Sequence, residues 1–288
     1  MTRTTSLAYQ YDGTFDGWLC CVFESYLWKE MPIAIHSAED PQGLLLEAKW
    51  IETDPEKAAR VRRSMPEKMG PEATEWIRLG FLTCVADKEL LLLRFLRLGY
   101  THGPTVMDRL ADDTVHALGK AIQQLRRESH DYLAFLRFSV YGSVMAAIIE
   151  PRNEVLSQIA EHFCERYRNE TFLIYDQTHR QAIVHRPGRY EIIPLDEWAP
   201  PEPDEAEEKY RRLWKGFYNA VGIRERRNHK LRASHMPKRY WRLLPEMQVG
   251  WRAGAHQGNA SHEYAADLKL RSVKPRSRLR STPGPEQY

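Results

Sequence analysis

Charge is divided unevenly along this chain of 288 residues. Residues 1–208 contain 23 Lys or Arg and 34 Asp or Glu, whereas residues 209–288 contain 19 and 5. At the end of the acidic part, residues 196–208 hold seven acids, no Lys or Arg, and three prolines. Because like charges repel and proline cannot donate a backbone hydrogen bond, we expect this stretch to form an extended surface linker. The sequence therefore predicts a domain that ends before the linker and a basic segment that follows it.

We expect four parts in the chain. They are an α+β domain at 1–195, the acidic linker at 196–208, a basic helical segment at 209–247 that packs back on the domain, and a tail at 248–288. The tail is poor in large apolar residues and rich in Gly, Ser, Arg and Pro, which is typical of disorder. The whole chain is 42% apolar and 28% charged, which excludes collagen, a coiled-coil rod and wholesale disorder.

The cysteines favour no disulfide framework and no metal site. They are few, scattered and outside any CxxC motif, which excludes a four-thiolate zinc site and a radical-type iron–sulfur loop. We therefore predict reduced thiols, no metal, no cofactor and a cytoplasmic protein. The residues concerned are Cys20, Cys21, Cys84 and Cys164.

No segment is apolar enough to suggest a membrane protein. The leucine run at 90–93 is followed by Arg94 and Arg97, far short of the roughly 20 apolar residues that a bilayer requires. Near the N-terminus, Asp12 interrupts the chain before a secretory hydrophobic region. We expect neither a membrane span nor a secretory leader.

Hydrophobic periodicity predicts a mixed α+β protein. A period of 3.6 residues indicates helices, one of which begins at a cap formed by Thr53 or Asp54, and another at a cap formed by Asn153. Strand spacing favours hairpins over βαβ crossovers, so we expect helices packed on a largely antiparallel sheet. The predicted helices are 15–29, 72–85, 88–98, 113–131 and 204–221, and the predicted strands are 7–11, 44–51, 135–141, 144–150, 171–176, 181–186 and 190–195.

The basic segment is the first candidate for function. Residues 209–242 hold 12 Lys or Arg and one acid, and a row of cations suits the charges of a nucleic-acid backbone. On the predicted helix at 204–221, Tyr210, Leu213, Trp214, Phe217 and Val221 form an apolar stripe, with basic side chains on the opposite side. The candidate nucleic-acid-binding residues are Arg211, Arg212, Lys215, Arg224, Arg226, Arg227, Asn228, Lys230, Lys238, Arg239, Tyr240 and Arg242.

Tyr240 and its neighbour Trp241 could also stack on unpaired bases. The alternative is a solvated basic face that covers an acidic patch of the domain, with core aromatics beneath it. In that alternative Trp241 and Leu244, three residues apart, belong to the core.

A second candidate is the group formed by Glu128, His130 and Arg137. A histidine beside arginines and a glutamate can transfer protons or bind phosphate, with His130 as acid or base. We expect His130 to lie beside Arg126 on one helix face, and Arg137 to lie on the following strand. An equally good interpretation is structural: these residues would form hydrogen bonds that fix the corner between the helix and the following strand.

A third group contains His162 and Arg166 on one helix and Asp176 at a strand end. Asp176 flanks a predicted hairpin turn, where aspartate is ordinary turn chemistry, so structural roles are favoured. The order of the residues excludes a His-Asp metal phosphohydrolase set. Walker, Rossmann, nucleophile-elbow and HExxH motifs are absent from the sequence.

A set of motifs is distributed over most of the chain, at 11–17, 22–25, 127–130, 135–138, 160–163, 174–176, 213–218, 223–228 and 236–241. Taken together, these motifs resemble an uncharacterised bacterial family described as DNA-metabolism and DNA-repair proteins. That family is encoded beside a radical-SAM protein assigned to DNA repair and is sometimes fused to a uracil-DNA glycosylase-like domain. The resemblance covers roughly residues 7–247, and we expect no glycosylase-like domain in this chain.

The resemblance implies a role in DNA repair or modification, and the basic segment supplies a means of binding DNA. We therefore expect a nucleic-acid-binding accessory partner of a radical-SAM enzyme. One alternative is an enzyme that acts on a DNA base or phosphate through His130. Another is a protein-interaction module, without nucleic-acid binding, whose basic segment contacts an acidic surface of its partner.

Overall fold

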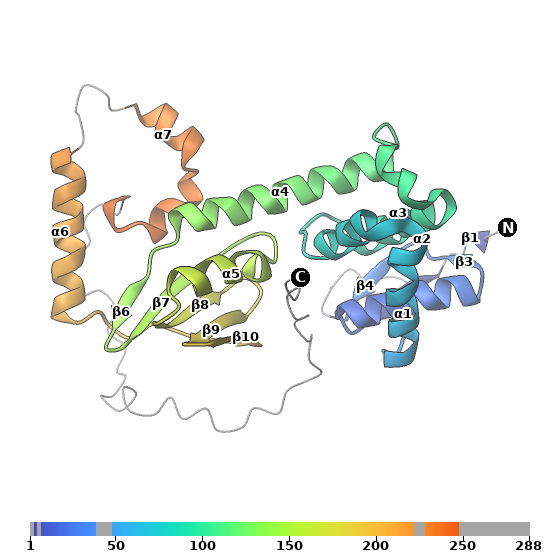
Figure 1. Cartoon of the computed structure of the whole chain (residues 1–288), viewed down its shortest axis with the longest axis horizontal. Coiled ribbons are helices and arrows are strands. Elements are labelled where there is room, and N and C mark those ends of the chain that lie inside the picture. The colour runs from blue at the N-terminus through green and yellow to red at the C-terminus, as the bar shows by residue number, and fades with distance from the viewer. Residues whose placement is uncertain (1–2, 5–6, 39–47, 222–227, 248–288) are drawn as a thin grey trace, which may run out of the picture. The chain divides into compact units, whose positions relative to one another are not determined.

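The structure is a computed structural model that describes residues 3–4, 7–38, 48–221 and 228–247 (Figure 1). The chain divides into two units, residues 1–248 and 249–288, and all described residues belong to the first. The predicted disordered tail at 248–288 lies outside the described residues.

The N-terminal region contains a parallel sheet. The described residues there form β1 (Arg3–Thr4), β2 (Ala8–Tyr11), α1 (Phe15–Leu27), β3 (Glu30–Met31), β4 (Ile35–Ser37) and β5 (Ala48–Trp50). β2 is central, and both β4 and β5 pair with it in parallel. Parallel neighbours need a crossover connection, and α1 provides the one between β2 and β4. The predicted strand at 44–51 is confirmed over 48–50, while residues 39–47 lie outside the described part.

A group of helices follows: α2 (Pro55–Phe81), α3 (Lys88–His102), the 3₁₀ helix η2 (Gly103–Asp108) and α4 (Asp113–Phe135). Asp54 caps α2 by accepting hydrogen bonds from the amides of Glu56 and Lys57, which confirms Asp54 over Thr53 as the cap. α2 contains residues 72–81 of the helix predicted at 72–85, and it bends at Gly70, where φ is 82°. The bend precedes Pro71, which has no amide hydrogen to donate.

The second sheet has strand order β10-β9-β8-β7-β6. β7 and β8 are parallel and all other neighbours are antiparallel, which confirms the α+β class with a largely antiparallel sheet. However, α5 is a crossover helix between β7 and β8, so the preference for hairpins holds only for the remaining pairs. The elements are β6 (Ser139–Tyr141), β7 (Val144–Ile149), α5 (Leu156–Arg166), β8 (Thr171–Asp176), β9 (Gln181–Arg186) and β10 (Arg189–Pro194).

Two local predictions are wrong. The strand expected at 135–141 begins only at Ser139, because α4 continues to Phe135. Asn153 does not cap α5, whose N-cap is Val155. The side-chain amide of Asn153 donates instead to a buried carboxylate of α4, and its carbonyl oxygen accepts a hydrogen bond from the amide of Cys84 at 2.9 Å.

The C-terminal described elements are α6 (Glu205–Val221), α7 (His229–His235), and the 3₁₀ helices η4 (Lys238–Leu243) and η5 (Pro245–Met247). α6 matches the helix predicted at 204–221 and begins inside the acidic stretch 196–208. Tyr240 and Leu244 are fully buried, and Tyr240 belongs to the main hydrophobic core. Within the described residues, no helix is both long and apolar enough to cross a bilayer.

Candidate functional site

A buried carboxylate on α4 organises a polar cluster. Glu128 is only 3% exposed, and it accepts hydrogen bonds from the amides of Arg152 at 3.1 Å and Asn153 at 2.9 Å. The side-chain amide of Asn153 donates to the same carboxylate at 2.6 Å. Nη1 of Arg239 lies 3.5 Å from Glu128 Oε1. A buried charge requires such partners, so Glu128 joins α4 to the loop after β7 and to η4.

Tyr240 lies beside this carboxylate. Its hydroxyl donates to Asp131 at 3.1 Å and accepts from Nη2 of Arg239 at 2.6 Å, and its ring packs edge-on against Tyr132 at 5.2 Å. Burial raises the pKa of both tyrosines well above the ordinary value. The prediction that Tyr240 offers a base-stacking face is therefore wrong, because its ring belongs to the core.

A histidine–aspartate pair closes the turn between β8 and β9. Asp176 is 1% exposed and accepts hydrogen bonds from the amides of Thr178 and His179 and from Nδ1 of His179 at 2.7 Å. Burial lowers the pKa of His179, but the hydrogen bond and negative charge of Asp176 outweigh it and raise that pKa above the ordinary imidazole value. Sequence reasoning singled out Asp176 and missed His179. The signal was available, because a histidine three residues after a turn aspartate can reach back to it.

The structure does not bring Glu128, His130 and Arg137 together. His130 is exposed on α4 although Glu128, two residues earlier, is buried, as expected when residues i and i+2 face different sides of a helix. Arg137 follows the helix rather than lying on a strand, and its guanidinium donates to the carbonyls of Ala134 and Leu136. These contacts match the helix–strand corner reading.

The residues of the third predicted group also lie in different environments. His162 and Arg166 are exposed on α5, and the Arg166 guanidinium lies 5.7 Å from the ring of Tyr167. Asp176 is buried in its turn with His179. Within the described residues, no group of three or more His, Cys, Asp or Glu side chains is placed to hold a metal ion.

Some of the predicted nucleic-acid-binding residues bond to other groups of the protein, and some are exposed. Arg211 pairs with Glu207 at 2.7 Å and also bonds Ser139, and Asn228 caps α7. Arg239 is engaged with Glu128 as described above. Lys215 is half-buried, and the other exposed cations of the set in the described part of the chain are Arg212, Lys230 and Lys238. We call these three the basic surface. Arg224, Arg226 and Arg227 lie outside the described residues, as does the side chain of Arg242.

The apolar stripe of α6 is exposed rather than packed. Tyr210, Leu213, Trp214, Phe217 and Val221 are all exposed. The helical period identified these residues as one face, but it did not indicate whether the face is covered.

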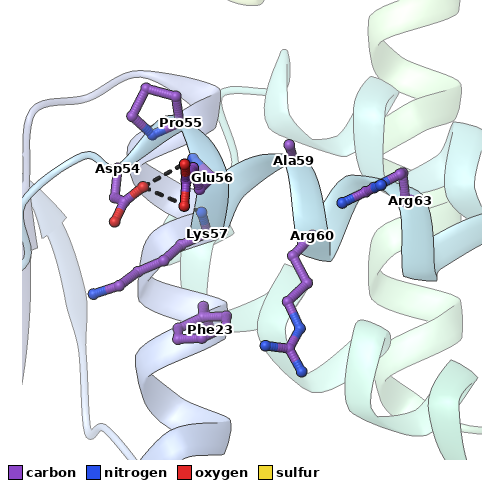
Figure 2. A pocket seen from close by; sticks show the side chains of 8 residues that line it. All are labelled: Phe23, Asp54, Pro55, Glu56, Lys57, Ala59, Arg60 and Arg63. Carbon is purple, nitrogen blue, oxygen red and sulfur yellow. Dashed lines mark hydrogen bonds between the residues drawn. The ribbon is translucent and has the colours of Figure 1, made fainter.

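A shallow hollow lies beside the first turns of α2, and sequence reasoning missed it (Figure 2). Lys57 Nζ and the Arg60 guanidinium lie 5.6 Å and 5.7 Å from the ring centre of Phe23, and Lys57 also pairs with Glu24 at 2.8 Å. Carboxylates and cations both line the hollow, so its charge selects no class of ligand. The lining residues are Phe23, Asp54, Pro55, Glu56, Lys57, Ala59, Arg60 and Arg63.

Comparison with known proteins assigns the chain to a family. The model of DUF4130, a domain of unknown function, matches residues 86–246, from the turn before α3 to η5. This range includes the Glu128 cluster, the Asp176–His179 pair, α6 and the basic surface, but not the hollow beside α2. No curated protein matches the chain. Since the matched range is more than half of the sequence, the chain belongs to the DUF4130 family.

Proposed function

We propose that this protein is a DNA-binding accessory protein of DNA repair or modification. It acts in the cytoplasm as a partner of a radical-SAM DNA-repair enzyme. The motif resemblance to the DNA-metabolism family supports the biological context and the partner. The basic surface is the observation that carries DNA binding, because Arg212, Lys230 and Lys238 present exposed cations from three successive elements, α6, α7 and η4.

Ion pairs within the protein reduce the number of residues that we expect to contact DNA. Arg211 and Arg239 each neutralise a carboxylate of the protein itself, so they are less suited to phosphate binding. The three residues of the basic surface are exposed within a segment that holds 12 bases and one acid. Each cation that meets a phosphate releases a condensed counterion, which makes binding weaken as salt rises.

Geometry favours binding over catalysis as the role of this chain. The catalytic alternative required His130 to work with Arg137 and Glu128. His130 is exposed, Glu128 is buried and accepts hydrogen bonds from the loop after β7, and Arg137 donates to backbone carbonyls at the end of α4. DNA binding requires only that cations reach the surface. The interaction-module alternative uses the same cations against an acidic protein, and the experiment below separates the two.

Fluorescence anisotropy of labelled 20-mer DNA across a salt series tests the proposal. Three phosphate contacts give a slope of log affinity against log salt of about −3 on duplex DNA and about −2 on single strands. Replacing Arg212, Lys230 and Lys238 together by alanine should reduce the magnitude of the slope by about 1 for each contact removed. Absence of binding to either DNA at low salt would refute the proposal.

A charge-matched control separates specific contacts from the loss of net charge. Arg168, Arg186 and Arg189 are exposed arginines of the α5–β8 loop, β9 and β10. Their triple alanine variant loses the same charge but should bind DNA like the unmodified protein. Equal weakening by both triple variants would contradict a defined basic surface. Retention of a purified radical-SAM partner after nuclease treatment, with no DNA binding by the chain alone, would favour the interaction module.

A further inference from the structure

The exposed stripe of α6 carries aromatic rings in a regular row. Tyr210 is 70% exposed, Trp214 is 42% exposed and Phe217 is 59% exposed. The rings of Trp214 and Phe217 lie 5.9 Å apart with 30° between their planes. Large aromatic side chains are seldom left in water over a contiguous stripe without a binding role.

We propose that this row is a stacking platform for the bases of single-stranded DNA. The proposal rests on the proposed DNA binding, and it states which form of DNA α6 binds. Along the axis of a helix, a step of four residues, as from Tyr210 to Trp214, covers about 6 Å. A step of three residues, as from Trp214 to Phe217, covers about 4.5 Å. Both steps exceed the 3.4 Å spacing of nucleotides along a duplex strand, so the row suits bases that have separated from one another.

The basic residues on and after α6 suit the backbone of such a strand, because residues 209–242 hold 12 Lys or Arg and one acid. At about 100° per residue, the exposed Lys209 lies about 100° to one side of Tyr210, next to the stripe. Lysine side chains are long enough to reach around a helix towards phosphates beside the stripe. A single strand offers bases and phosphates together, whereas a duplex hides the faces of its bases. Aromatic rings flanked by cations are the usual means of binding single strands without sequence preference.

Part of the platform is held in place before binding. Nε1 of Trp214 donates to Glu246 of η5 at 2.9 Å, which ties the indole to a neighbouring element. A ring that is already fixed loses less conformational entropy when a base stacks on it. Tyr210 and Phe217 are the residues to replace in a test, because a change at Trp214 also removes this hydrogen bond.

An apolar stripe can also dock on a protein, and the chain offers a matched control for that reading. Leu213 and Val221 lie on the same stripe and are 59% and 62% exposed, but their side chains have no π face. Their alanine variants remove apolar area without removing stacking. Docking on a protein, including a second copy of this chain, depends on both kinds of side chain.

The test compares the Tyr210→Ala, Phe217→Ala double variant with the Leu213→Ala, Val221→Ala double variant. Affinity for single-stranded and duplex 20-mers is measured by anisotropy, oligomeric state by light scattering, and folding by circular dichroism. The aromatic variant should lose at least about tenfold in single-strand affinity and little in duplex affinity. Tyr210→Phe, which keeps the ring, and the aliphatic variant should bind both DNAs like the unmodified protein.

The outcomes separate this inference from the proposed function. If the unmodified protein binds neither DNA at low salt, both are overturned. Salt-dependent DNA binding that the aromatic variant retains in full overturns the stacking platform and leaves the proposed function intact. A dimer that dissociates in both double variants makes the stripe a protein interface and likewise overturns the platform.

Discussion

Arg239 Nη1 lies 3.5 Å from the buried carboxylate of Glu128, across 111 positions of sequence. The same guanidinium donates to the hydroxyl of Tyr240, and that hydroxyl donates to Asp131 of α4, so an ion pair and a hydrogen bond join η4 to α4. A residue that sequence alone assigns to DNA binding thus contributes to the fold. The first two predictions examine the two ends of this ion pair.

Replacing Glu128 by alanine should strongly destabilise the protein. The change removes the acceptor of three hydrogen bonds from Arg152 and Asn153 and the anionic partner of Arg239. Leaving buried groups unpaired costs about 3 kcal/mol or more in unfolding free energy. Urea denaturation should show a lower midpoint with an unchanged slope. His130→Ala, an exposed change two residues away, should alter the unfolding free energy by less than about 0.5 kcal/mol.

Replacing Arg239 by alanine should lower stability while leaving DNA affinity unchanged. Its side chain is 38% exposed, so solvent screens the ion pair and the expected cost is about 1 kcal/mol. DNA anisotropy on the folded variant should match the unmodified protein, in contrast to the variant of the basic surface. A reduced salt slope for Arg239→Ala would instead place this residue among the phosphate contacts.

The Asp176–His179 pair should make stability depend on pH. Because the folded state raises the pKa of His179, this pair stabilises the protein fully below the unfolded value of about 6.5. That stabilisation is lost as pH rises through the folded pKa. The unfolding free energies of the unmodified protein, His179→Gln, Asp176→Asn and the double variant form a cycle. The coupling energy should be larger at pH 5.5 than at pH 8.5, and an equal coupling at both pH values would contradict a charged pair.

Two glycines should respond to alanine in opposite directions. A Cβ at Gly17 would lie 2.2 Å from Asp12 Oδ1 and 2.9 Å from a ring carbon of Tyr11, so Gly17→Ala must disturb the start of α1. The expected cost is about 1–3 kcal/mol. A Cβ at Gly216 in α6 meets nothing within 4 Å, so Gly216→Ala should stabilise the helix by about 0.5–1 kcal/mol. Thermal denaturation of both variants measures the two signs.

The sequence by itself determined the fold class and several of the elements. Helical periods located α1 and α6, and the rule that aspartate followed by proline begins a helix located the start of α2. These features depend on residues within a few positions of each other, so local sequence is sufficient to predict them. The same local patterns could not show that α4 continues to Phe135, because packing against Tyr240 is a contact with a distant segment.

Only the tertiary structure decided which polar and aromatic side chains reach the surface. Asn153 was predicted as a helix cap and Tyr240 as a base-stacking face, and both instead belong to the cluster around Glu128. The stripe on α6 was visible as a pattern, yet its exposure depends on whether another element covers it. A sequence period predicts which residues share a face. The contacts around Glu128, by contrast, join residues more than 20 positions apart in the chain, so local sequence could not predict them.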